Sequence, residues 1–442
     1  MRKFLSQTAH LNRAIISDDF EKTLGIIKKR VPIKILKYPT GSHCFDWIIP
    51  KKWIIRDAYI KDSNGKRILD WKKTPLHVVI GSLSIKKKIT KKELLKKIYV
   101  SDDLPNEIPY HFQYYELDWG FSMAKKDLSK LKGDWFDIEI DSEYVDGNLT
   151  MGEATIKGAS SKCIVLMAHI DHPAQVNDGL AGAAVLIKLF EFLKARPQAY
   201  TLKFHFLPER IGSIAYLANH KKDLRNILGG IFCEMPGTKG YPLALQYSKY
   251  KDTRMDRVAR YVVKRSDKRS LFCDCYLHIV NDDGFYNSSG IDIPCISLSR
   301  SRALKDNNFY HCPGYHTSKD NLRNFDFKQT ERYLGALKEI IAILNADRKI
   351  IRNYNGIPNL SRHNLWVDWR VDKVVSQNLE NILNSIENNV SIFDIADHLQ
   401  IDFYEVASFM KKMAKCGLVK LTSTESIWFG NMKPGNFKLT NN

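Results

Sequence analysis

Short apolar runs alternate with helical patterns along residues 146–345, and this alternation limits the fold more than any other feature of the sequence. The run Cys163–Ala168 has the length and composition of a buried strand, and apolar residues recur with a helical period in Gly179–Leu193. Thr201–Leu207 and Gly230–Cys233 predict two further strands. A chain with this pattern folds as an α/β layer structure, with helices packed against a sheet.

The other parts of the chain differ from this stretch in composition. Residues 1–35 are predicted to be helical and to belong to the same domain as the α/β core, which spans residues 146–350. Residues 36–145 are rich in Trp, Tyr, Ile and turn formers, which predicts an inserted β-rich lobe. Residues 365–435 are predicted to form a separate helical domain at the C-terminal end.

The C-terminal domain has the element order of a winged helix. Helices are predicted over Asp372–Glu387, Ile392–Leu399 and Asp402–Lys415. Two apolar runs follow, Leu418–Leu421 and Ile427–Phe429, and they predict the two strands of a wing. The last helix carries lysines that could meet phosphates, but also apolar residues that need a core or a protein partner. DNA binding is therefore the less favoured interpretation of this domain.

Histidines and carboxylates follow the predicted strands, at the point where each strand ends. In open α/β sheets, ligands bind beyond the carboxyl ends of the strands, so we expect these side chains along one edge. They are His169, Asp171, His172, Asp178, Glu209 and Glu234, and a later loop adds His311, His316 and Asp320; Arg210 and Tyr315 are next to Glu209 and His316. Histidines and carboxylates without thiolates form the kind of site that binds a divalent metal such as Zn²⁺.

The stretch His169-Ile-Asp-His-Pro-Ala-Gln-Val-Asn-Asp178-Gly-Leu-Ala-Gly resembles the zinc-binding segment of M28-type aminopeptidases. Phe206-Leu-Pro-Glu209-Arg and Ser289-Gly-Ile-Asp-Ile-Pro294 extend the resemblance to bacterial proteins that combine an aminopeptidase-like domain with a C-terminal winged helix. The resemblance covers nearly the whole chain. It implies a three-layer zinc-exopeptidase-like α/β core with a mixed sheet, an inserted β-rich lobe and a winged-helix domain.

The resemblance also implies a set of zinc ligands. His169 and Glu234 would bind one zinc ion, Asp178 would be a ligand shared by two metal positions, and His316 would bind at the second position. Two-metal members of the family have a second glutamate where this chain has Arg210. Because arginine cannot bind a cation, one zinc ion is favoured over two.

Catalytic and substrate-binding roles follow from the same resemblance. Glu209 would be the general base of a hydrolysis in which zinc acidifies the attacking water. Asp171 would orient His169 by holding its other ring nitrogen. The substrate-binding candidates are Arg210, Asp282, Asp283 and Tyr315. A guanidinium suits a substrate carboxylate, whereas the two aspartates would contact a substrate amine or replace the lost ligand. The remaining histidines, His172, His205 and His311, are interpreted as loop or packed strand residues rather than ligands.

Three functions stay open on this basis. The first is a zinc-dependent aminopeptidase-like hydrolase that cleaves a peptide or amide bond near a free amine. The second is a deacylase of a modified amino sugar or another small amide in surface-polysaccharide metabolism, because a fold does not set the substrate. The third is a DNA-binding regulator whose peptidase-like domain senses a ligand. The presence of Glu209 favours an enzyme, since a sensor needs no general base.

Composition narrows the setting in which the protein acts. The chain of 442 residues has a net charge of +19, but its lysines lie in short scattered runs, so we interpret this charge as spread over solvated faces. The eight cysteines form no dense framework and predict free thiols in a reducing compartment. With no signal peptide or long apolar span, we expect a cytoplasmic, homo-oligomeric protein that acts away from membranes on small substrates. The lobe of residues 36–145 is expected to cover the active site.

Overall fold

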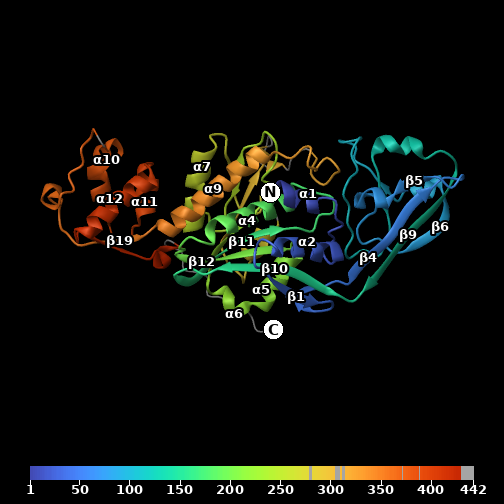
Figure 1. Cartoon of the computed structure of the whole chain (residues 1–442), viewed down its shortest axis with the longest axis horizontal. Helices are drawn as coiled ribbons and strands as arrows, with labels where there is room; N and C mark the ends of the chain where they lie inside the picture. The colour runs from blue at the N-terminus through green and yellow to red at the C-terminus, as the bar shows by residue number, and fades with distance from the viewer. Residues whose placement is uncertain (278–280, 304–308, 311–313, 371, 388, 430–442) are drawn as a thin grey trace.

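The computed structural model describes residues 1–277, 281–303, 309–310, 314–370, 372–387 and 389–429 (Figure 1). The described chain is elongated, with three parts in a row: a β-rich lobe, an α/β core in the middle and a helical domain at the other end. Within the described residues, no helix combines the length and the apolar character that crossing a membrane requires.

An eight-stranded mixed sheet forms the centre of the core. Its order is β1 (Lys34–Pro39), β10 (Asn148–Ile156), β12 (Tyr200–Leu207), β11 (Ser160–His169), β13 (Ile227–Cys233), β16 (Cys295–Arg300), β14 (Leu243–Gln246) and β15 (Leu271–Cys273). Strands β12, β11, β13 and β16 run parallel, whereas the pairs β1–β10, β10–β12 and β14–β16 are antiparallel. The predicted α/β core with a mixed sheet is therefore confirmed.

Helices cover both faces of this sheet, and the alternation of side chains along β11 shows why. Successive residues of a strand face opposite sides, so β11 contributes to two apolar cores. Ile164, Leu166 and Ala168 belong to one, and Cys163, Val165 and Met167 belong to the other. The first core is closed by α1 (Arg2–Thr8), α2 (Asp18–Lys28), α4 (Leu180–Leu193), α7 (Arg254–Ser266) and α9 (Phe327–Ala346). The second is closed by α5 (Ile211–Asn219), α6 (Lys221–Leu224) and α8 (Asp282–Tyr286).

The register of the parallel strands brings the predicted site residues to one edge of the sheet. His169, the last residue of β11, pairs with Leu207, the last residue of β12. Met167 pairs with Phe232 in β13, which puts Glu234 level with His169. The polar residues that follow these strands therefore meet at the carboxyl edge, as the sequence pattern predicts.

The lobe has a sheet and an apolar core of its own. Its antiparallel strands lie in the order β5 (Arg67–Asp70), β4 (Lys52–Lys61), β9 (Trp135–Val145) and β6 (Ile85–Thr90). Because β1 pairs with β10 in the central sheet, the lobe's own sheet begins later than the predicted boundary at residue 36.

The remaining elements of the described chain are short. They are β2 (His43–Cys44), β3 (Trp47–Ile48), α3 (Lys91–Leu95), β7 (Ile98–Tyr99), β8 (Phe121–Ser122), β17 (Arg302–Ala303), β18 (Phe309–Tyr310) and 3₁₀ turns at Trp71–Lys73, Pro75–His77, Lys125–Lys130, Leu360–His363 and Glu425–Ile427.

The C-terminal domain contains the three predicted helices, α10 (Lys373–Asn384), α11 (Ile392–Leu399) and α12 (Phe403–Lys415). The predicted wing is wrong in its second strand. The strand β20 (Val419–Thr422) pairs with β19 (Lys349–Arg352), which enters from the core, and a 3₁₀ turn follows it. Trp428 is buried against Tyr200 of β12, with the two rings 5.1 Å apart. The apolar residues assigned to a wing strand therefore fasten the domain to the core instead.

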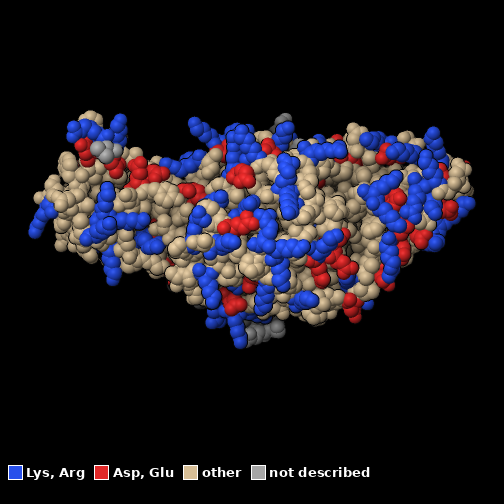
Figure 2. Space-filling view, viewed as in Figure 1, with Lys and Arg blue, Asp and Glu red and all other residues tan. Residues whose placement is uncertain are grey.

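Charge and cysteine usage agree with the interpretation of the composition. On the face shown in Figure 2, Lys and Arg are spread from the lobe to the C-terminal domain, with acidic groups between them. The described cysteines are free thiols, and all of them except Cys275 and Cys416 are buried.

Candidate metal centre

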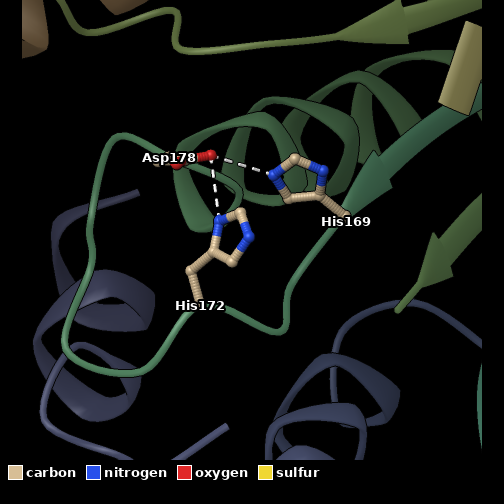
Figure 3. Close-up of side chains that lie close together, drawn as sticks. All are labelled: His169, His172 and Asp178. Atoms are coloured by element: carbon tan, nitrogen blue, oxygen red, sulfur yellow. Dashed lines mark hydrogen bonds and ion pairs between the residues drawn. The ribbon is translucent and has the colours of Figure 1, made fainter. Parts of the chain in front are cut away.

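Two histidines converge on one carboxylate oxygen beyond the end of β11 (Figure 3). The Nε2 atom of His169 lies 3.0 Å from Oδ1 of Asp178, and Nδ1 of His172 lies 3.1 Å from the same oxygen. The three side chains are buried, and they offer ligand atoms that all lie within 4.8 Å of one another. Two imidazoles and a carboxylate at this spacing are a ligand set that zinc accepts.

Two more residues of the predicted ligand set surround this cluster. The Nε2 atom of His316 lies 3.1 Å from the other Asp178 oxygen, Oδ2. An oxygen of Glu234, which follows β13, lies 3.9 Å from Nε2 of His169. The structure thus brings together all four predicted ligands, His169, Asp178, Glu234 and His316, and places His172 beside them.

Hydrogen bonding within the cluster fits a metal ion better than a closed polar network. Several buried atoms form no well-directed hydrogen bond with a described residue: Nδ1 of His172, Oδ2 of Asp178, both carboxylate oxygens of Glu234 and Nε2 of His316. A buried polar atom without a partner costs about 1–3 kcal/mol, so such a concentration of them is unusual. Nitrogen and oxygen lone pairs that converge in this way favour a bound cation.

The pKa values of Glu234 and His172 are shifted in the direction that favours bound protons or a cation. Burial raises the pKa of Glu234 well above its usual range, and the charges of Asp178 and Glu209 add to the effect. Burial alone would lower the pKa of His172, but the carboxylates of Asp178 and Glu209 outweigh it and raise that pKa well above the usual value. The carboxylates therefore need protons on the imidazoles or a metal cation in their place.

The carboxylate beside the second ring nitrogen of His169 comes from Asp282 and not from Asp171. Asp171 accepts a hydrogen bond from the backbone N–H of Glu209 at 2.8 Å, so it supports the loop after β12. The carboxylate beside Nδ1 of His169 is Asp282, whose Oδ2 lies 3.5 Å away. The predicted role of Asp171 as the partner of His169 is therefore wrong, and Asp282 of α8 takes that position.

The predicted substrate contacts of Asp282 and Asp283 are also wrong, because neither side chain is exposed. The Oδ1 atom of Asp282 accepts hydrogen bonds from the Arg210 backbone N–H at 2.9 Å and from the Ser213 hydroxyl at 2.7 Å. The side-chain amide of Gln246 donates to Asp283 at 2.7 Å. Burial raises the pKa of Asp283 to about 7. Both aspartates brace the protein beneath the site rather than facing a ligand.

Arg210 occupies a strained turn directly after Glu209. Its backbone has φ 60° and ψ −63°, and the N–H of Ile211 donates to the carbonyl of Glu209 at 2.6 Å, which is the geometry of a classic γ-turn. Such strain in a non-glycine residue persists only where surrounding contacts enforce it, here the bond from its N–H to Asp282. The Arg210 side chain is exposed, with its guanidinium 5.5 Å from the Phe285 ring centre.

The β-rich lobe reaches the cluster of His169, His172 and Asp178 through residues 108–112. The backbone N–H of Tyr110 donates to the carbonyl of His316 at 2.8 Å, and the Tyr110 ring lies 4.9 Å from the His316 ring and 5.3 Å from the His172 ring. A cavity of about 410 Å³ lies between lobe and core. It is lined by Val100, Ser101, Pro109, Tyr110, His111, Phe112, Tyr315, His316 and Thr317. The predicted cover over the site is present, and Tyr315 lies in its wall.

Other residues show what a reading of the sequence misses. His172 stands in the cluster, although its loop position suggested a peripheral role; its spacing of three residues from His169 was the available signal. His205 behaves as predicted: it is buried in β12, with Nε2 3.0 Å from a Glu153 oxygen. His311 lies outside the described residues. Asp320 accepts hydrogen bonds from the backbone N–H groups of Asn177 and Asp178 and so holds the turn that carries Asp178.

Fold and site together define an aminopeptidase-like α/β protein. The structure is similar to a solved structure provisionally described as a peptidase from Clostridium acetobutylicum, with a TM-score of 0.86 and 28% identity over 95% of each chain. The fold is also that of the zinc aminopeptidase from Bacillus subtilis, with a TM-score of 0.55 and 14% identity over 77% of this chain and 93% of that one.

Sequence comparison places the chain in a family. Residues 3–347 match the family described as Domain of unknown function (DUF4910), and the chain belongs to it. A protein of Clostridium acetobutylicum is 30% identical over 417 residues, which cover 92% of this chain and 93% of the relative. That relative is provisionally described as a polysaccharide biosynthesis protein with an aminopeptidase-like domain.

Proposed function

We propose that this protein is a zinc-dependent aminopeptidase-like hydrolase that cleaves a peptide or amide bond near a free amine. The observation that carries the proposal is the convergence of unpartnered imidazole and carboxylate atoms at the carboxyl edge of an aminopeptidase-like sheet. His169, Asp178, Glu234 and His316 would hold zinc there. When bound, zinc would polarise the scissile carbonyl and make an attacking water more acidic.

Glu209 is the proposed general base. It follows β12 at the edge of the cluster, and its side chain is 20% exposed, so water can reach it. Burial would raise its pKa, but His172 lowers that pKa to about 2, which keeps the group ionised at neutral pH. Its Oε2 atom faces His172, and Oε1 is the oxygen that would accept the proton and pass it to the leaving amine.

The surroundings of the cluster favour a small substrate. The cavity of about 410 Å³ beside His316 suits a small ligand, and aromatic rings line it. We propose that Tyr315 contacts the substrate in this cavity. The exposed guanidinium of Arg210, one residue from the base, is the proposed anchor for a substrate carboxylate.

A deacylase of a modified amino sugar is the second candidate. The Clostridium acetobutylicum relative is provisionally described as a polysaccharide biosynthesis protein, and the aromatic cavity offers flat apolar surfaces on which a sugar ring can lie. The same metal and the same base would serve both reactions. A cytoplasmic, homo-oligomeric enzyme stays our prediction, supported for the compartment by the free thiols.

The test has two parts, metal content and turnover. Elemental analysis of the purified protein is expected to find about one zinc ion per chain, and the absence of zinc after reconstitution would overturn the proposal. Hydrolysis of aminoacyl p-nitroanilides and of N-acetylhexosamines then separates the two candidates. At saturating zinc, Glu209→Gln is expected to lower kcat by about 10²–10⁴-fold on the correct substrate.

A further inference from the structure

We infer that His172 is itself a ligand of the zinc ion, through Nδ1, and that Glu209 is the carboxylate that orients its ring. This inference rests on the proposed function, because it concerns the same metal. It gives Glu209 a second task beside that of general base. His172 would also replace the metal ligand that is missing at position 210, where this chain has an arginine instead of a glutamate.

The Nδ1 face of His172 is placed as a ligand would be. It lies 3.1 Å from Oδ1 of Asp178, the oxygen that Nε2 of His169 approaches to 3.0 Å. His169, His172 and Asp178 offer ligand atoms that all lie within 4.8 Å of one another (Figure 3). The His172 Nδ1 atom is buried and has no well-directed hydrogen bond to a described residue, which leaves its lone pair for a cation.

The opposite face of the same ring meets a carboxylate. The Nε2 atom of His172 lies 3.0 Å from Oε2 of Glu209. Ligating histidines almost always give their second ring N–H to a carboxylate or carbonyl, which fixes the tautomer and the direction of the ring. With the proton held on Nε2 by Glu209, Nδ1 is the nitrogen that binds the metal.

The turn that carries His172 is built to hold it in place. Arg13 is fully buried, and its guanidinium donates hydrogen bonds to the backbone carbonyls of Ile170, His172 and Gln175. Burying a guanidinium costs free energy, which these hydrogen bonds offset. They hold the backbone of the turn on both sides of His172. The ring also packs 5.3 Å from the ring of Tyr110. The position of the imidazole therefore follows from a rigid frame.

The chain contains a matched control for this arrangement. His205 is buried like His172, and its Nε2 atom lies 3.0 Å from a Glu153 oxygen, the same distance as in the His172–Glu209 pair. The Nδ1 atom of His205 meets the Tyr286 hydroxyl at 3.5 Å rather than a carboxylate. Replacing either histidine by glutamine removes a buried imidazole, but only one of the two replacements removes a donor from the cluster.

The experiment measures zinc affinity of the full chain, stripped of metal and titrated against a chromogenic chelator. We expect His172→Gln to bind zinc more than about 100-fold more weakly than wild type, and His205→Gln to match wild type. Cobalt(II) added to the stripped protein should show a changed visible absorption in His172→Gln alone. Wild-type affinity and an unchanged cobalt spectrum in His172→Gln would overturn the inference and leave the proposed function standing.

Glu209→Gln tests the second half of the inference without disturbing the buried turn. As the partner of a ligand, Glu209 is expected to raise zinc affinity by about 10–100-fold, so the variant should bind zinc more weakly by that factor. A group that serves only as a base would leave zinc affinity unchanged, and that result would overturn the pairing. Failure of the wild-type protein to bind zinc is a different outcome, which overturns the proposed function itself.

Discussion

Two histidine–glutamate pairs in this protein have the same Nε2–oxygen distance and opposite surroundings. In the His172–Glu209 pair, the far ring nitrogen faces Asp178, whereas in the His205–Glu153 pair it faces the Tyr286 hydroxyl. Neighbouring carboxylates raise the pKa of His172, but burial lowers the pKa of His205. A carboxylate partner on one ring nitrogen therefore does not distinguish a metal-binding histidine from a packing histidine. The distinguishing feature is the other ring nitrogen, which faces a further carboxylate in the proposed ligand.

The largest expected effect is at Asp178, which contacts three imidazoles of the cluster. We expect Asp178→Asn to weaken zinc binding by more than about 100-fold, because it removes the charged ligand around which the histidines gather. Glu153→Gln, the matching change in the other pair, should leave zinc affinity unaltered. Equal zinc affinities of the two variants, measured by chelator competition, would remove the distinction drawn between the pairs.

A smaller loss of zinc affinity is expected at Asp282. Its Oδ2 atom lies beside Nδ1 of His169, so Asp282→Asn should weaken zinc binding by about 10–100-fold. Ser213→Ala removes a hydrogen bond to the other oxygen of Asp282 and controls for general loosening of α8. If the serine variant weakens zinc binding as much as the aspartate variant does, Asp282 acts on the fold rather than on His169.

Zinc removal should lower the thermal stability of the protein, and this effect should depend on the His172–Glu209 pair but not on the His205–Glu153 pair. At a free zinc concentration of roughly 1,000 times the Kd, binding to the folded chain stabilises it by about 4 kcal/mol. The midpoint of thermal unfolding should therefore fall when a chelator removes the zinc. In His205→Gln, the shift caused by the chelator should equal that of wild type, whereas in His172→Gln it should shrink. The measurement is differential scanning calorimetry with and without chelator.

The smallest effect concerns acid stability of the second pair. Burial alone would raise the pKa of Glu153, but His205 and Lys203 lower this pKa to about 2. A carboxyl whose folded pKa is depressed contributes stability above its unfolded pKa, which is lost as pH falls toward the folded value. The stability advantage of wild type over Glu153→Gln, from denaturant unfolding, should therefore shrink between about pH 4.5 and pH 2. An advantage that is constant over this range would show that the pair carries no such charge interaction.

Much of the core could be predicted from the sequence, because local patterns decide it. Strand β11 and helix α4 lie where the apolar runs and the helical period put them, and helices α11 and α12 begin after their N-cap residues. His169 and Glu234 were expected at one edge because the carboxyl ends of parallel strands meet there, whereas the full set of four ligand candidates came from the family resemblance. The second wing strand was wrong because the burial of Trp428 depends on Tyr200, a residue far away in the sequence.

The sequence by itself determined the α/β core, the chemical character of the site and the residues at the ends of its strands. Hydrophobic periodicity and the order of strands are local properties, and they carry that information. Only the tertiary structure decided which nitrogen faces which oxygen. His172 points at Asp178 because Arg13, 159 residues away from it, holds its turn, and Asp282 reaches His169 because α8 packs beneath the strained turn at Arg210. Contacts between distant segments leave no periodic trace in a sequence, so only the folded chain shows them.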